Sequence, residues 1–218
     1  MESVPYAKAI GGVMYTMIST RLDITFAVSV LTRFMSKPGE EHYKGLKWLL
    51  RYLKATPSHG LRFSKEGTKI QLEGYVDSDY ASNRDTRKSI TSYCFHLNGC
   101  CISWKAQLKL VVTLFTTEVE FMAITEAFKE AVWIKGILSE VQMITGKVTV
   151  FSDSQSTIHL CKNHVFHERL LWIINKIEEG EVEVEKVPSE ENLTDVGTKV
   201  LSISKFQHCL ELLNIGSN

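Results

Sequence analysis

Four acidic side chains in this sequence stand at the edges of different predicted elements, far apart along the chain. They are Asp77, Glu120, Asp153 and Asp195. Divalent cations such as Mg²⁺ prefer hard oxygen ligands, which carboxylates supply. An acid at the end of a strand is also an ordinary turn former, so each position has a structural interpretation beside the catalytic one. The recurrence of such acids at four separate elements favours a metal site.

Two of these acids follow predicted strands. Residues 70–77 have an extended pattern that ends in Asp77, and the apolar strand predicted over 147–152 is followed directly by Asp153. Ligands of open α/β sheets bind at the carboxyl ends of strands, where Asp153 would lie. The structural alternatives are a turn that starts at Asp77 and a helix N-cap at Asp153.

The long helix predicted over residues 116–141 carries two neighbouring acids, which helical geometry separates. At 100° per residue, Glu120 lies within about 40° of an apolar stripe, whereas Glu118 lies about 160° away from it. The stripe consists of Ile124, Ala127, Ala131, Ile134 and Leu138. A charge on the side that faces the sheet is costly unless it is ligated or paired. We therefore expect Glu120, rather than Glu118, in the site.

Asp195 lies near the start of the last predicted helix, residues 192–214. Asn192 stands three residues before it, which is a possible capping-box arrangement. Taken alone, Asp195 is better explained as part of a helix start. Only its recurrence with the other three acids makes it a candidate metal ligand.

The remaining elements of the second part of the chain complete a mixed α/β layer fold. Strands are predicted over residues 89–97 and 100–107, joined by the strong hairpin signal Asn98-Gly99. Residues 181–187 alternate Val and Glu, which is typical of a half-buried strand. Helices are expected over residues 153–162 and 166–179.

The first 69 residues form a separate, mostly helical piece in this interpretation, and residues 70–218 form the α/β domain. Helices are predicted over residues 6–20, 24–35 and 40–54, followed by a short strand near 60–63. Residues 1–70 carry 11 Lys/Arg and 5 Asp/Glu, and the rest carries 14 and 20, so the net charge of zero hides an asymmetry. The basic front suits phosphates, although solvated basic faces are common.

Composition places the chain among ordinary globular proteins, with 44% hydrophobic and 23% charged residues. Its five cysteines show no Cys-x-x-Cys pair, which favours reduced thiols over a disulfide framework or a zinc site. No apolar run of about 18 residues could span a membrane, and the N-terminus lacks a signal-peptide pattern. We expect a soluble, intracellular protein.

Six motifs follow one another after residue 70. They are residues 74–81 (Gly-Tyr-Val-Asp-Ser-Asp-Tyr-Ala), 87–93 (Arg-Lys-Ser-Ile-Thr-Ser-Tyr), 102–105 (Ile-Ser-Trp-Lys), 116–123 (Thr-Thr-Glu-Val-Glu-Phe-Met-Ala), 153–156 (Asp-Ser-Gln-Ser) and 191–195 (Glu-Asn-Leu-Thr-Asp). In this order they resemble the ribonuclease H domain of Ty1/copia-type retrotransposon Pol polyproteins. The front piece resembles the tail of the preceding reverse transcriptase, at residues 4–6, 20–23, 33–35 and 48–52. The polymerase's own catalytic Asp-Asp motif is absent, so DNA synthesis is not implied.

The resemblance implies a ribonuclease H-like fold, with a five-stranded mixed sheet of three antiparallel and then two parallel strands flanked by helices. It also implies a catalytic, metal-binding set of Asp77, Glu120, Asp153 and Asp195 that holds two Mg²⁺ ions, with Mn²⁺ as a possible substitute. In the family's chemistry the RNA strand of an RNA–DNA hybrid is cleaved, one ion activating water and the other stabilising the departing 3′ oxygen. By analogy Asp77 would bridge both ions, Asp195 would lie on the water side, and the other two acids would lie on the leaving-group side.

The implied partners are an RNA–DNA hybrid and the upstream reverse transcriptase domain, with no membrane. The implied location is the cytoplasm, in a virus-like particle, or the nucleus. Phosphate contacts dominate the affinity of proteins for nucleic acids. The candidate phosphate-binding residues are Arg84, Arg87, Lys88 and Lys105, with Lys109 beside them. Trp104 could stack on a base or sugar, but it fits a core position better.

Departures from the family's pattern leave a second interpretation open. The helix between residues 169 and 177 is about two turns shorter than in the family, and Leu22 and Leu193 stand where the family commonly has Pro. A histidine that assists product release in related enzymes has no clear counterpart near Asp195. The alternative to the endonuclease is therefore a truncated, inactive Pol remnant that binds nucleic acid or serves as a structural module.

Overall fold

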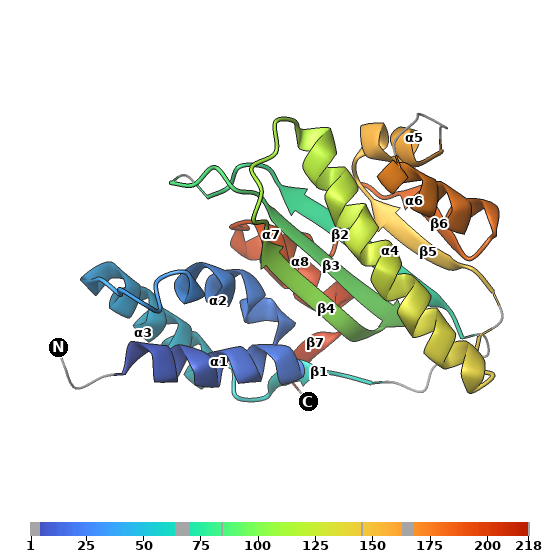
Figure 1. Ribbon diagram of the computed structural model, residues 1–218. Coiled ribbons are helices and arrows are strands. Elements are labelled where there is room, and N and C mark those ends of the chain that lie inside the picture. Colours follow the sequence, from blue (N-terminus) through green and yellow to red (C-terminus); the bar gives the residue numbers. More distant parts are fainter. Residues whose placement is uncertain (1–4, 64–69, 84, 145, 163–167, 218) are drawn as a thin grey trace.

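A five-stranded mixed sheet forms the centre of the fold (Figure 1). The computed structural model describes residues 5–63, 70–83, 85–144, 146–162 and 168–217. The strands of the central sheet are β2 (Leu72–Asp79), β3 (Ile90–Leu97), β4 (Cys100–Leu108), β5 (Val148–Ser152) and β6 (Val182–Lys186). Their spatial order is β4-β3-β2-β5-β6. The first three strands are antiparallel, and β5 and β6 run parallel to β2, which confirms the expected ribonuclease H-like arrangement.

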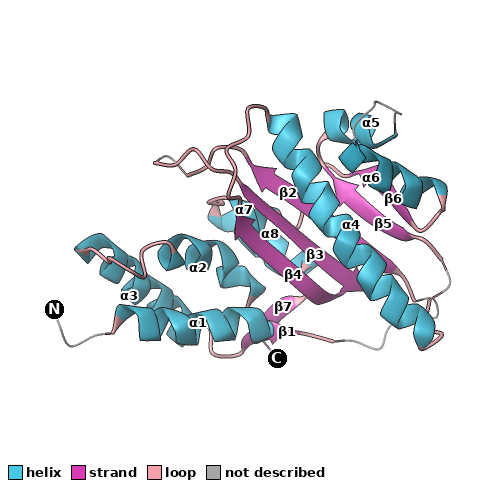
Figure 2. Cartoon of the chain, viewed as in Figure 1, coloured by secondary structure: helices cyan, strands magenta, loops and turns pink. Residues whose placement is uncertain are grey.

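Helices cover both faces of this sheet (Figure 2). On one face lie α4 (Thr116–Glu140), α5 (Gln155–Lys162) and α6 (Glu168–Glu178), and on the other lie α7 (Asp195–Thr198) and α8 (Ile203–Leu212). The apolar stripe predicted for the long helix is buried against the sheet, together with the fully buried Phe128. Apolar residues at helical spacing give α4 one apolar face, and burial of this face against the sheet holds the two layers together.

A tight hairpin joins β3 to β4, as its sequence predicts. Asn98 and Gly99 have φ angles of 51° and 74°. Both values are left-handed, which is what a two-residue type I′ turn requires. The hairpin fixes the register of β3 and β4, in which Leu97 pairs with Cys100.

The prediction of one closing helix over residues 192–214 is wrong. The segment forms two helices, α7 and α8, because Lys199 between them is extended, with φ −139° and ψ 165°. Ser202 then caps α8, and its side chain accepts a hydrogen bond from the backbone N–H of Lys205 at 3.3 Å. After α8 the chain forms a further short strand, β7 (Ile215–Ser217), which the sequence did not predict.

The front piece has its own apolar core. It contains α1 (Tyr6–Thr20), a 3₁₀ turn (Leu22–Ile24), α2 (Thr25–Thr32), α3 (Glu40–Ala55) and the short strand β1 (His59–Leu61). The pair Gly11-Gly12 does not interrupt α1. Arg21 and Asp23 form a buried ion pair at 2.8 Å, and the Tyr52 hydroxyl donates to Asp23 at 2.7 Å.

The two parts of the chain are linked by a second, two-stranded sheet. β1 of the front piece pairs antiparallel with β7, so the last strand returns to the first part of the chain. The predicted boundary near residue 69 lies outside the described residues, and the division at that point stays a prediction. None of the helices in the described ranges is long and apolar enough to cross a bilayer.

Candidate metal centre

Three of the four predicted acids meet at one end of the sheet. Asp77, Glu120 and Asp153 each offer a carboxylate oxygen, and these oxygens lie within 4.8 Å of one another. Asp77 lies on β2, Glu120 lies near the start of α4, and Asp153 follows β5 directly. Because β2 and β5 are parallel neighbours, the carboxyl ends of the two strands bring the two aspartates together.

Burial makes two of these carboxylates unusually basic. Asp77 is 1% exposed, and burial raises the pKa of its carboxyl group well above the usual value, although Lys199 acts in the opposite direction. Burial also raises the pKa of Glu120 to about 7. Oε2 of Glu120 is buried and has no hydrogen-bond partner among the described residues. A buried carboxylate oxygen without a partner is costly, and a bound cation would remove that cost.

Asp153 is more accessible than Asp77, and residues after β6 orient it. Its side chain is half-buried. The Ser189 hydroxyl donates a hydrogen bond to Oδ2 of Asp153 at 2.8 Å, and Lys186 donates to its backbone carbonyl. The segment after β6 therefore holds this carboxylate beside the end of β5.

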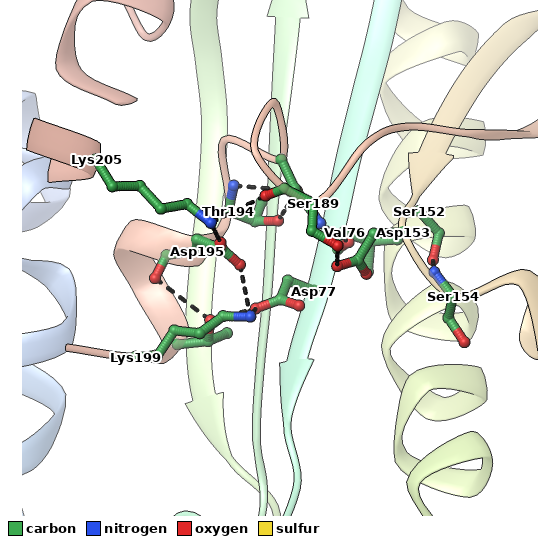
Figure 3. Close-up of polar contacts among 12 residues, drawn as sticks. Val76, Asp77, Ser152, Asp153, Ser154, Ser189, Thr194, Asp195, Lys199 and Lys205 are labelled. Atoms are coloured by element: carbon green, nitrogen blue, oxygen red, sulfur yellow. Dashed lines mark hydrogen bonds and ion pairs between the residues drawn. The ribbon is translucent and has the colours of Figure 1, made fainter. Parts of the chain in front are cut away.

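Asp195 lies next to this group, but lysines hold it. Its Oδ1 atom is 2.8 Å from Nζ of Lys199, and its Oδ2 atom pairs with Nζ of Lys205. Nζ of Lys199 is also 3.4 Å from Oδ2 of Asp77, so the two carboxylate oxygens are no more than about 6.2 Å apart, the sum of these two distances. Figure 3 shows Lys199 reaching between Asp195 and Asp77, with Asp153 beyond Asp77.

Further polar side chains, which the sequence did not indicate, hold Asp77 and the segment that carries Asp195 in place. The Thr198 hydroxyl donates to Oδ2 of Asp77. The Asn192 amide donates to the carbonyl of Val76 at 3.0 Å, and its Oδ1 accepts from the Thr194 hydroxyl at 2.6 Å. Asn192 therefore fastens the turn before α7 to β2, whereas the sequence had suggested a capping box.

One signal in the sequence could have revealed a lysine partner. Asp195 and Lys199 are four residues apart, which is the spacing at which ion pairs form along a helix. The contact of Lys199 with Asp77 joins positions too far apart in the chain for such a pattern to predict.

Gly197 allows α7 to approach the sheet closely. A Cβ atom at this position would lie 2.4 Å from Oγ of Ser92 and 3.1 Å from its Cβ. Only a residue without a side chain fits between α7 and β3. The close approach places Asp195, at the start of α7, in a fully buried position.

The side chains fit one divalent cation more readily than two. Asp77, Glu120 and Asp153 supply three hard oxygen ligands, and few protein ligands suffice for Mg²⁺ because it keeps waters and binds substrate phosphates. A second cation between Asp77 and Asp195 would meet the ammonium group of Lys199. With the described side chains as they stand, a cation could enter the first position without displacing Lys199, whereas the second position requires Lys199 to move.

The predicted phosphate-binding residues lie in different settings. Arg87 is exposed in the loop after β2, at the end of the sheet that carries Asp77, and Lys88 beside it is half-buried. Lys105 is exposed on β4, and Arg84 lies outside the described residues. Among the other candidates, Lys109 is buried, and burial lowers its pKa. Trp104 packs against the core beside α7 and α8, which supports its interpretation as a core residue.

Curated relatives cover the whole chain. The retrovirus-related Pol polyprotein from transposon TNT 1-94 of Nicotiana tabacum is 41% identical over 100% of this chain and 17% of its own length. The Pol polyprotein from transposon RE1 of Arabidopsis thaliana is 34% identical over 95% of this chain and 14% of its own. Secreted RxLR effector protein 161 of Plasmopara viticola is 46% identical over 62% of this chain and 94% of its own. The chain thus spans less than a fifth of either polyprotein.

No protein-family model matches the chain. Among solved structures, the LC11-RNase H1 complex with RNA/DNA hybrid is 14% identical and covers 56% of this chain and 88% of its own, with a TM-score of 0.39. The foamy viral protease-reverse transcriptase in complex with RNA/DNA hybrid is 12% identical and covers 90% of this chain and 26% of its own, with a TM-score of 0.46. The strand order β4-β3-β2-β5-β6 and the helices on both faces of the sheet define the ribonuclease H-like fold of the chain.

Proposed function

Because the chain belongs to the family of Ty1/copia-type retrotransposon Pol polyproteins, we propose that it is a ribonuclease H, a metal-dependent endonuclease that cleaves the RNA strand of RNA–DNA hybrids. The proposal concerns only the span that the chain shares with these much longer relatives. The observation that carries it is the convergence of Asp77, Glu120 and Asp153, three acids from distant parts of the chain, within 4.8 Å.

In this proposal the three acids hold a divalent cation, Mg²⁺ or Mn²⁺. When bound, the cation lowers the pKa of a water molecule and neutralises charge on the departing 3′ oxygen. The protein contributes position: β2 fixes Asp77, Ser189 orients Asp153, and α4 holds Glu120 where burial strengthens its interaction with a cation. A two-ion form of the mechanism adds Asp195 as the fourth ligand.

The proposed substrate is recognised by its backbone. Arg87 and Lys88 lie at the same end of the sheet as the carboxylates, and Lys105 and the basic front piece extend the positive charge. Phosphate contacts from such groups give affinity, and contacts to the 2′-hydroxyl select the RNA strand. The upstream reverse transcriptase domain is the proposed partner, in a cytoplasmic virus-like particle or in the nucleus.

The direct test is cleavage of a hybrid whose RNA strand is labelled, in Mg²⁺, by the wild type and by Asp77→Asn. We expect the wild type to cut the RNA strand and to leave RNA–RNA and DNA–DNA duplexes intact, and the variant to be inactive. Glu118→Gln is the matched control, because it removes a carboxylate from the same helix outside the site. Absence of cleavage by folded wild type in both Mg²⁺ and Mn²⁺ would contradict the proposal.

One observation favours the second candidate function, a nucleic-acid-binding module without turnover. Asp195 is already paired with two lysines. Its negative charge is therefore balanced without a second cation, which two-ion cleavage would need. This candidate predicts that the folded protein binds the hybrid with a Kd that depends steeply on salt and never cuts it. A gel-shift assay beside the cleavage assay separates the two functions.

A further inference from the structure

We propose that Lys199 is a positioning residue whose ammonium group acts as a built-in counter-ion between Asp77 and Asp195, and that it must withdraw before a second divalent cation binds there. The inference deepens the proposed function, since it concerns the same carboxylates, but it is a statement about cation binding and can be tested without cleavage. It also explains why three of the four acids form a group that could hold a cation, whereas Asp195 is occupied by a lysine.

The contacts define a bridge. Nζ of Lys199 lies 2.8 Å from Oδ1 of Asp195 and 3.4 Å from Oδ2 of Asp77. The side chains of the two aspartates are 1% and 2% exposed, respectively. Two buried carboxylates this close repel one another unless a positive charge lies between them. Lys199 supplies that charge in the protein without metal.

The bridging side chain is also the accessible member of the trio. Lys199 is 37% exposed along its side chain, and the next residue, Val200, is 84% exposed. Lys199 itself is the extended residue between α7 and α8. A lysine has a flexible stem and a strongly hydrated head, so it can turn to water while β2 keeps Asp77 in place and α7 keeps Asp195 in place.

Lys205 differs from Lys199 in one respect that makes it a control. It pairs with Oδ2 of Asp195 and donates to the carbonyl of Ser189 at 2.9 Å. The described contacts of Lys205 do not include Asp77. Removing Lys205 takes the same charge from Asp195 but leaves the bridge to Asp77 intact.

The experiment counts bound cations and measures Tm in EDTA and in Mg²⁺ for the wild type, Lys199→Met, Lys199→Arg and Lys205→Met. We expect one Mg²⁺ per chain for the wild type by calorimetric titration. For Lys199→Met we expect a second ion bound at least about tenfold more tightly than any second ion of the wild type. The same variant should lose about 5 °C of Tm in EDTA and regain it in Mg²⁺. Lys199→Arg should behave as the wild type, and Lys205→Met should gain no ion.

An unchanged ion count in Lys199→Met, or a gain shared equally by Lys205→Met, would overturn the inference. If Lys199→Met does not fold in EDTA, Mn²⁺ titration of the wild type followed by electron paramagnetic resonance decides the matter. Two Mn²⁺ ions of equal affinity with Lys199 in place would overturn the inference. None of these measurements involves cleavage, so their outcome and that of the proposed ribonuclease H activity are separable.

Discussion

The two halves of the carboxylate centre balance their charge in opposite ways. On one side of Asp77, Glu120 and Asp153 bring negative charge together, and the ion pairs of the described residues include neither carboxylate, although Lys199 is near enough to oppose the rise in the pKa of Glu120. On the other side, Asp195 is fully buried and is paired with Lys199 and Lys205. The first half therefore needs a cation from solution, whereas the second half contains its own.

This difference separates the acids proposed to bind a cation from an acid that also stabilises the fold through ion pairs. An uncompensated buried carboxylate lowers stability until a ligand arrives, and a buried ion pair loses stability when one partner is removed. Substitutions in the two halves should therefore have opposite effects on the metal-free protein.

The largest expected effect is on activity in the uncompensated half. Glu120→Gln should lower hybrid cleavage and Mg²⁺ affinity by at least about 100-fold, because the proposed metal ligand is lost and even hydrogen-bond partners of metal ligands contribute about 10–100-fold. Glu118→Gln should stay within about twofold of the wild type, since its carboxylate accepts a hydrogen bond from the backbone of Leu114. Steady-state cleavage and calorimetry measure both quantities, and equal losses in the two variants would contradict the assignment.

The next effect is on stability and has opposite signs in the two halves. Asp195→Asn should lower the free energy of unfolding of the metal-free protein by about 3 kcal/mol, because two lysines lose their charged partner. Glu120→Gln should raise it by about 1–2 kcal/mol at pH 8, because a desolvated charge is removed. Urea unfolding in EDTA measures both. A change of the same sign in the two variants would break the comparison.

The pH dependence of stability should come chiefly from the uncompensated half. The pKa of Glu120 is raised from 4.5 to about 7 by burial, so the folded protein keeps a proton that the unfolded chain has lost. Stability from this group is fully present below pH 4.5 and is lost as the pH rises to about 7, by roughly 2–3 kcal/mol. Urea unfolding in EDTA between pH 4 and 8 should show this loss, and Glu120→Gln should flatten it. An unchanged profile in the variant would assign the loss to other groups.

The smallest expected effect concerns the packing under Asp195. Gly197→Ala should cost about 1–3 kcal/mol, since the added Cβ meets Ser92. Gly136→Ala on α4 is the control, because nothing lies within 4 Å of its added Cβ, and it should stabilise the protein by about 0.5–1 kcal/mol. Thermal unfolding of both variants tests the pair. Equal stabilisation by both would show that α7 does not rest on β3 as described.

Local periodicity was enough to predict the elements that bring Asp77, Glu120 and Asp153 together. The helical stripe selected Glu120 over Glu118, and α4 buries that stripe against the sheet. The strand patterns put Asp77 and Asp153 at or near the carboxyl ends of two strands, and parallel pairing of β2 with β5 makes them neighbours. Helix and strand periods depend on adjacent residues, so a single sequence carries this information.

The second half depends on contacts between distant positions, and the sequence did not reveal it. Thr198 binds Asp77 and Asn192 binds Val76 across more than 100 residues. Where a single helix was expected, the chain that makes these contacts forms α7, an extended Lys199 and α8. A polar residue at a helix start matches a cap pattern whatever it touches, which is why Asn192 was interpreted as part of a capping box.

The pairing of β1 with β7 has a consequence for the processing of a longer chain. Leu61 pairs with Ile215 and Gly60 with Gly216, and Leu22 of the front piece shares an apolar cluster with Leu213. A protease that cut the polypeptide between β1 and β2 would therefore not release the front piece. The two fragments would run as separate bands on a denaturing gel and migrate as one particle in solution. The cut would break the covalent link between them but would not dissociate them.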